Sequence, residues 1–186
     1  MTKNIAVIIL SVGLAFGLVR DAGAQDEARP EDVSTIDGIM KAYYEVVSGP
    51  AGAEREWARD RSLHHPEAQI AIIRNGDDGR AAVRIMTLAD FHGPPEPAQN
   101  VFYEYEINRE VRRHGANAHV WSTYEWRSQE NGPARGRGIN SVQMYFDGSR
   151  WWITEWMYDG RTDAPAVQDA YLPENRWGDR TEGTRP

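Results

Sequence analysis

GRGINSVQMYFDGSRWWITEWMYDG, residues 136–160, is the stretch that decides the fold of this chain. Val142, Met144 and Phe146 alternate with polar neighbours, which is the pattern of a strand with one buried face, and an aromatic, β-branched run follows. The Asp147-Gly148 pair between the two runs supplies the positive-φ residue that a tight turn needs. The stretch therefore predicts a β-hairpin whose tryptophans must be covered by another layer of structure.

Two more hairpins are predicted upstream of this one. Residues 68–74 and 80–86 are strand-like runs that flank a turn cluster rich in Asn, Gly and Asp. Residues 101–111 and 119–127 form a longer pair around a turn at residues 114–117. The three hairpins together predict an antiparallel sheet of about six strands.

The longer hairpin has two faces of different character. With its turn centred on Gly115-Ala116, strict alternation gives an inward face made of Val101, Tyr103, Tyr105, Ile107, Val111, Val120, Tyr124 and Trp126. The same register gives an outward face made of Phe102, Glu104, Glu106, Asn108, Trp121, Thr123 and Glu125. We therefore expect Glu104 and Glu106 to be solvated, near Arg112 and Arg127.

Helical patterns precede the strands. Between residues 32 and 47, apolar side chains recur every three or four positions, and Ser48-Gly49-Pro50 ends the run. Residues 54–64 are a second, more charged helical segment, and Thr87 can cap a helical turn over residues 87–91. Helices followed by strands in hairpins predict an α+β fold, with the helices on one side of a curved sheet.

The first 24 residues have the features of a secretory signal peptide. Lys3 gives a positive start, residues 5–19 are an uncharged apolar run, and Ala22-Gly23-Ala24 is a small-residue cleavage site. The alternative is a membrane anchor, but the apolar run is shorter than the ~20 residues that a spanning helix needs. We therefore expect removal of residues 1–24 and a periplasmic or secreted protein that is not membrane-bound.

The remaining chain is long enough, at about 160 residues, for one domain with a sizeable core. We expect this domain over residues 32–173 and a flexible C-terminal tail over residues 174–186. The whole chain has a formal net charge of −7, and removal of a segment with a net charge of +1 leaves −8. This acidic balance argues against nucleic acid as a partner. The chain has no cysteine, so no disulfide supports the core.

Two groups of motifs resemble the nuclear-transport-factor-2-like superfamily, which includes SnoaL-like and ketosteroid-isomerase-like proteins. The first is Ser48-Gly49-Pro50-Ala51-Gly52 between two helices, followed by Trp57, Arg61-Ser62-Leu63 and His65-Pro66-x-Ala68. The second is residues 138–143 with Asp147-Gly148-x-Arg150-Trp151-Trp152-Ile153, which looks like the closing hairpin of an exported bacterial branch. The resemblance implies a strongly bent, cone-shaped antiparallel sheet wrapped around the first helix, with a pocket at its open end. It implies no single chemistry, because the superfamily includes isomerases, cyclases, dehydratases and accessory domains.

Aromatic side chains are the most distinctive candidates for a binding site. A cavity lined by Tyr and Trp suits a flat apolar ligand, because the rings supply contact area and their polar tips fix its orientation. The candidate ligand-binding residues are Tyr43, Tyr44, Trp57, Tyr103, Tyr105, Tyr124, Trp126, Asn140 and Trp156. Plain core packing is the alternative use of the same rings.

Three functions stay open at this point. We favour an exported binding or accessory domain that holds a small apolar or aromatic ligand without transforming it. The second is a cofactor-independent isomerase, cyclase or hydratase, in which Tyr43 or Tyr44 acts with Asp60, Glu104 or Glu106 in the way of ketosteroid isomerase. The third is a filled pocket, with the sheet face as a protein interface. A carboxylate or His at the pocket floor, within hydrogen-bond reach of a Tyr, would favour the enzyme.

The sequence contains no recognised metal or cofactor motif. His64-His65 and His92 are histidine candidates, but adjacent side chains point apart and no HExxH spacing is present. Gly136-x-Gly138 is followed by a strand rather than by a helix, so it does not predict a phosphate site. We therefore expect no metal and no cofactor. The resemblance also implies a homodimer, formed through the outer sheet face that carries Ser141 and Gln143. The alternative is a monomer whose outer sheet face is solvated.

Overall fold

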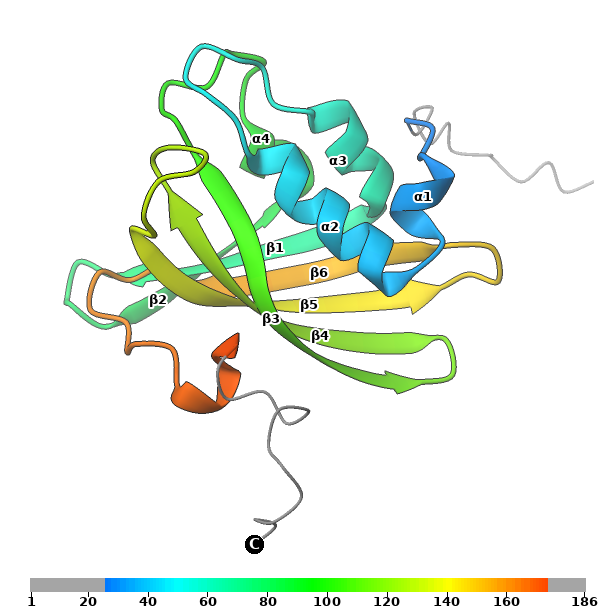
Figure 1. Cartoon of the computed structure of the whole chain (residues 1–186). Coiled ribbons are helices and arrows are strands. Elements are labelled where there is room, and N and C mark those ends of the chain that lie inside the picture. The colour runs from blue at the N-terminus through cyan, green and yellow to red at the C-terminus, as the bar shows by residue number, and fades with distance from the viewer. Residues whose placement is uncertain (1–25, 174–186) are drawn as a thin grey trace, which may run out of the picture.

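Residues 26–173 are described by the structure, which is a computed structural model (Figure 1). The predicted signal peptide over residues 1–24 and the predicted tail over residues 174–186 lie outside the described residues, so both stay predictions. Within the described range, no helix is long and apolar enough to cross a membrane.

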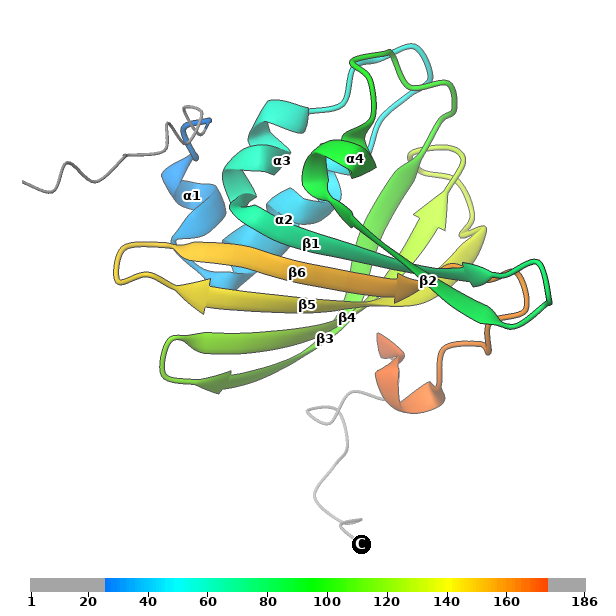
Figure 2. The same cartoon turned by 180° about the vertical axis from the view of Figure 1, so that it is seen from behind.

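One curled sheet of six strands organises these residues (Figures 1 and 2). The strands are β1 His64–Asn75, β2 Ala81–Thr87, β3 Tyr103–His114, β4 Asn117–Arg127, β5 Gly136–Phe146 and β6 Trp151–Asp159. Their order is β2-β1-β6-β5-β4-β3, and neighbours are antiparallel except for the parallel pair β1 and β6. The predicted α+β fold and its three hairpins are confirmed. The parallel pair leaves no local signal, because it joins strands that are far apart in the sequence.

The helices lie together on the face around which the sheet curls (Figures 1 and 2). They are α1 Pro30–Val33, α2 Ile36–Val47, α3 Trp57–Leu63 and α4 Leu88–His92. The Thr35 hydroxyl accepts a hydrogen bond from the Gly38 amide at the start of α2. Thr87 and Asp90 form a capping box at the start of α4. Side-chain oxygens therefore satisfy free amides at the start of both helices.

The inward side chains of the central hairpin pack against the helices in a single core. Val142 and Met144 of β5 are 0% and 1% exposed, and Ile153 of β6 is fully buried. Ile39 and Met40 of α2 are also fully buried and belong to the same cluster. The inward face that alternation predicts for β5 is therefore confirmed.

A β-bulge at Ile107 interrupts the pairing of β3 with β4. Val111 pairs with Val120, as strict alternation predicts. Before the bulge, however, it is Glu106 and not Ile107 that pairs with Tyr124. Because β3 holds one extra residue at this point, every side chain of β3 before the bulge changes face.

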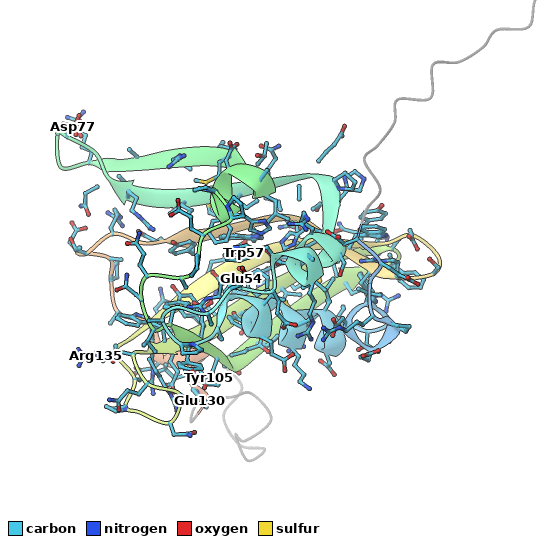
Figure 3. The ribbon with its side chains drawn as sticks, turned by 90° about the horizontal axis from the view of Figure 1, so that it is seen from above. Glu54, Trp57, Asp77, Tyr105, Glu130 and Arg135 are labelled. Carbon is cyan, nitrogen blue, oxygen red and sulfur yellow. The ribbon has the colours of Figure 1, made fainter. Side chains whose placement is uncertain are left out.

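The predicted faces are therefore wrong for the first half of β3. Glu104 and Glu106 point inward, towards the helices, and Tyr103 and Tyr105 point outward. The Tyr105 hydroxyl donates to the Glu130 carbonyl at 2.9 Å, and Figure 3 shows the two residues side by side at the edge of the molecule. Alternation alone does not show a bulge, because both registers leave aromatic and apolar residues on each face.

The chain itself covers part of the outer face of the sheet. A short 3₁₀ helix, η1 Asp169–Tyr171, lies on the side opposite the helices (Figures 1 and 2). The Tyr171 carbonyl accepts hydrogen bonds from Asn108 and Thr123, both at 2.9 Å. Val83 and Ile85 of β2 are 56% and 63% exposed. Pairing of two copies through the outer face stays a prediction.

Arg59 joins the first three helices. Its Nε and Nη2 atoms donate to the two carboxylate oxygens of Asp32 at 2.7 and 2.8 Å. Further hydrogen bonds reach Glu45 on α2 and Glu56 at the start of α3, each at 2.8 Å. The side chains of Arg59 and Asp32 are only 12% and 6% exposed. The pair is therefore largely desolvated, and removal of either partner would leave the other as an uncompensated buried charge.

We predict that Arg59→Met lowers the free energy of unfolding by about 3 kcal/mol, because Asp32 then keeps a buried charge without a partner. Urea denaturation measures this difference. Lys41→Met is the control, since the Lys41–Glu45 pair is 76% and 43% exposed and should contribute less than about 0.5 kcal/mol. Equal losses in the two variants would contradict the role assigned to Arg59.

Candidate functional site

A pocket of about 580 Å³ opens between the helices and the inner face of the sheet. This volume is in the range of sites for small molecules. Its walls come from α2, α3, α4, five of the strands and residues 160–166, which follow β6. The aromatic lining residues are Tyr43, Phe91, Phe102, Tyr124, Trp126, Trp156 and Tyr158. Seven aromatic side chains therefore line this pocket, and its use as a ligand site stays a prediction.

Of the nine candidate binding residues, those that line the pocket are Tyr43, Tyr124, Trp126, Asn140 and Trp156. Tyr44 and Trp57 are not among the lining residues. Trp57, which Figure 3 labels on α3, stacks on His92 with 4.4 Å between ring centroids. Tyr103 and Tyr105 are turned away by the bulge in β3. Binding of a ligand by the five lining residues stays a prediction.

Two glycines of β5 make room for the aromatic wall. Gly136 and Gly138 pair with Trp126 and Tyr124 across the β4–β5 ladder. A Cβ atom at residue 136 would lie 2.5 Å from the Trp126 Nε1 atom, and one at residue 138 would lie 2.4 Å from the Tyr124 hydroxyl. Both rings therefore lie against backbone that carries no side chain. The Gly-x-Gly pattern on the strand that pairs with these two aromatic residues is the sequence signal that could have predicted this part of the pocket lining.

Glu104 is the pocket residue that strict alternation missed. Its amide donates to the Ser48 hydroxyl at 3.0 Å, which ties β3 to the end of α2. Its half-buried side chain lines the pocket together with the aromatic rings. Desolvation raises the pKa of Glu104 to about 8. The group is therefore largely protonated at neutral pH and still able to ionise.

Glu106, the other inward carboxylate of β3, has a different environment. It accepts hydrogen bonds from Arg109 and from the Ser122 hydroxyl. Ser122 is bonded in turn to the Tyr44 hydroxyl at 2.7 Å, and Asn140 donates its amide to the same hydroxyl at 3.2 Å. This network fixes the Asn140 side chain in the pocket wall. These hydrogen bonds give Glu106 a structural role. Among the described residues, no comparable hydrogen bond or ion pair reaches the Glu104 carboxylate.

The arrangement of helices on a curled sheet is shared with known structures. The beta subunit assigned to an aromatic-ring-hydroxylating dioxygenase from Novosphingobium aromaticivorans aligns at 17% identity with a TM-score of 0.50, over 75% of this chain and 95% of that chain. A nuclear-transport-factor-2-like protein from Methylobacillus flagellatus aligns at 18% identity and 0.41, over 67% and 90%. A cystatin-like protein from Nostoc punctiforme aligns at 10% and 0.41, over 57% and 78%. At a TM-score of 0.50, the dioxygenase beta subunit shares the α+β arrangement of this chain.

At these identities the likeness concerns the fold and not the chemistry. The sequence matches no protein-family model, and no curated protein matches it either. The superfamily that the motifs suggest, and its exported branch, stay predictions.

Asp60 is a second carboxylate that lines the pocket. It is 3% exposed, and its Oδ2 atom lies 2.7 Å from His92 Nε2. His64 is bonded to the Asp60 carbonyl at 2.9 Å and accepts from Trp156 Nε1 at 3.1 Å. Asp60 therefore already has a hydrogen-bond partner. Within residues 26–173, no group of three or more His, Cys, Asp or Glu side chains is placed to hold a metal ion.

Tyr43 and Tyr124 supply hydroxyl groups to the same pocket. Burial, followed by the neighbouring Tyr44 and Glu104, raises the pKa of Tyr43 well above its usual value. Burial and then Glu104 raise the pKa of Tyr124 as well. Both hydroxyls therefore stay protonated and can donate hydrogen bonds. The pocket can hold a ring, donate to a polar group on it, and exchange a proton through Glu104.

We predict that Gly138→Ala costs about 2 kcal/mol of stability, because the new methyl group would overlap the Tyr124 ring. Chemical denaturation measures the loss. The same substitution in a Tyr124→Leu background should cost less than about 0.5 kcal/mol, because the shorter side chain removes the overlap. A loss that does not depend on residue 124 would contradict the close contact.

Proposed function

We propose that the pocket binds a small, ring-containing and largely apolar molecule, and that Glu104 exchanges a proton with it. The observation that carries this proposal is the environment of Glu104. Its carboxyl lines a pocket of ligand size, and desolvation raises its pKa to about 8. A proton-transfer group works best when its pKa lies near the working pH.

The size and lining of the pocket support a ring-shaped ligand. Tyr43 and Trp156 meet edge to face with centroids 5.9 Å apart, and Phe91 meets Trp156 in the same way at 4.9 Å. Phe102 stacks on Trp126 with centroids 6.2 Å apart. These contacts fix the rings before a ligand arrives, so little side-chain entropy is lost on binding.

Glu104 differs from the other carboxylates in this region in ways that support proton transfer. Glu106 is paired with Arg109, and Asp60 is hydrogen bonded to His92. Desolvation alone accounts for the raised pKa of Glu104, so no positive group holds it ionised. In its neutral form it can protonate a ligand, and in its ionised form it can remove a proton from carbon. This is the isomerase, cyclase or hydratase alternative, with Glu104 as its acid or base.

A binding domain without chemistry is the second candidate. The interactions of the described residues include no hydrogen bond from the Tyr43 or Tyr124 hydroxyl to the Glu104 carboxylate. A neutral Glu104 would then serve only as a hydrogen-bond donor to the ligand. The two candidates share the pocket and differ in whether the ligand changes.

We predict that Glu104 makes stability fall as the pH rises. In the unfolded chain its pKa is the ordinary 4.5, and in the folded protein it is about 8. Between these values the folded state holds a proton that the unfolded state has lost, so the stabilising difference is lost progressively up to about pH 8.

Glu104→Gln removes this dependence. Relative to the wild type, it should gain about 4 kcal/mol in free energy of unfolding between about pH 4 and pH 8. Urea denaturation across this range measures the change. Glu110→Gln, on the same strand, is the control and should follow the wild type. Parallel pH curves for Glu104→Gln and the wild type would contradict the raised pKa.

We also predict proton exchange on a bound ligand. In D₂O, the protein should speed deuterium uptake at the α-carbon of some members of a panel of cyclic ketones, as followed by NMR. Glu104→Gln should reduce the rate by about 100-fold or more, whereas Glu110→Gln should keep it. Ketones that bind but show no uptake dependent on Glu104 would leave the binding domain as the function.

A further inference from the structure

Arg74, near the end of β1, is held in place at the pocket wall. Its Nη2 atom donates to the Tyr158 hydroxyl at 2.7 Å and its Nη1 atom to the Ile73 carbonyl at 3.2 Å. The guanidinium carbon lies 5.1 Å from the centroid of the Tyr158 ring. A Cβ atom at Gly160 would lie 1.4 Å from Nη1. Glycine at residue 160 is therefore what lets the guanidinium occupy this position.

The other arginines that line the pocket each lie against a carboxylate. Arg161 contacts Asp159 at 2.6 Å, and Arg137 lies 3.5 Å from Glu125. Arg74 makes no ion pair with a carboxylate in the part of the chain that the structure describes. It does help to lower the pKa of Asp159, but the first cause of that shift is the hydrogen bond with Arg161. Arg74 thus brings a positive charge to the pocket that protein groups do not cancel.

Arg74 on β1 and Glu104 on β3 line the pocket from strands that three other strands of the sheet separate, and Tyr124 of β4 lines it as well. After burial, the charge of Glu104 is the largest contribution that raises the pKa of Tyr124, and Arg74 acts in the opposite direction. Tyr124 therefore lies within electrostatic reach of both groups. Glu104 itself is not stabilised in its charged form by Arg74, since desolvation alone sets its shift. The pocket therefore has a largely neutral carboxyl group on β3 and a guanidinium cation on β1, on strands far apart in the sheet.

The geometry points to a ligand with an anionic group, such as a carboxylate or sulfonate, that meets Arg74 while its rings lie against the aromatic wall. This inference rests on the proposed function, because it names the class of molecule that the same pocket takes. A planar guanidinium matches such oxyanions with two parallel hydrogen bonds. The anion fixes the ligand's orientation, so its opposite, ring end meets Glu104.

Two fluorescent probes of the same shape test this inference. 1-Anilinonaphthalene-8-sulfonate carries a sulfonate, and N-phenyl-1-naphthylamine has the same rings without it. We expect the wild type to bind the sulfonate more tightly. Arg74→Met should weaken sulfonate binding by about tenfold and change neutral-probe binding by less than about twofold. Fluorescence titration measures both affinities.

Three variants test whether the sulfonate preference depends on Arg74 itself rather than on net charge, and whether the probes bind inside the pocket. Arg84→Met, outside the pocket lining, removes the same charge and should keep the sulfonate preference. Gly160→Ala keeps the charge but displaces the guanidinium, so it should reduce the preference even if Arg74→Met fails to fold. Ala164→Trp, at the pocket lining, should weaken both probes if they occupy the pocket.

The possible outcomes are distinct. A sulfonate preference lost in Arg74→Met or Gly160→Ala, and kept in Arg84→Met, supports the inference. If both probes bind in the pocket without a preference that depends on residue 74, the inference is overturned and the pocket remains. If neither probe binds, or Ala164→Trp has no effect on either, the proposed function fails together with it.

Discussion

The pocket depends on one extra residue in β3. Without the bulge at Ile107, strict alternation would turn Tyr105 inward and Glu104 out to water. The bulge reverses these faces while the rest of the hairpin keeps its expected pairing. It also lies next to the pocket, where bulges commonly redirect a side chain towards a functional site. A carboxyl group thereby replaces a phenol in the wall.

Desolvation then gives the redirected carboxyl its properties. Phe102, Trp126 and the end of α2 leave Glu104 little contact with bulk water, and this raises its pKa to about 8. The same environment makes the ionised form costly to the fold. Glu106 shows the alternative, because Arg109 and Ser122 satisfy an inward carboxylate two residues away. Two similar side chains on one strand therefore have different tasks, which their neighbours determine.

The aromatic wall rests on two features of the backbone. Gly136 and Gly138 allow the rings of Trp126 and Tyr124 to lie against β5, and Gly160 allows Arg74 to lie against the chain that follows β6. In each case a large side chain takes the space that a Cβ atom would fill. The shape of the pocket is therefore set as much by glycines as by the aromatic residues that line it.

The sequence by itself determined the elements and the fold class. Alternation on β5, the Asp147-Gly148 turn and the period of α2 are local patterns, and local patterns are what neighbouring residues can encode. They also identified Tyr43, Trp126 and other rings as candidates for a cavity wall. The tertiary structure alone decided the parallel β1–β6 pair, the bulge in β3 and the presence of Glu104 in the pocket. These features depend on contacts between distant segments, and one extra residue on a strand reverses its faces without changing the composition of the pattern.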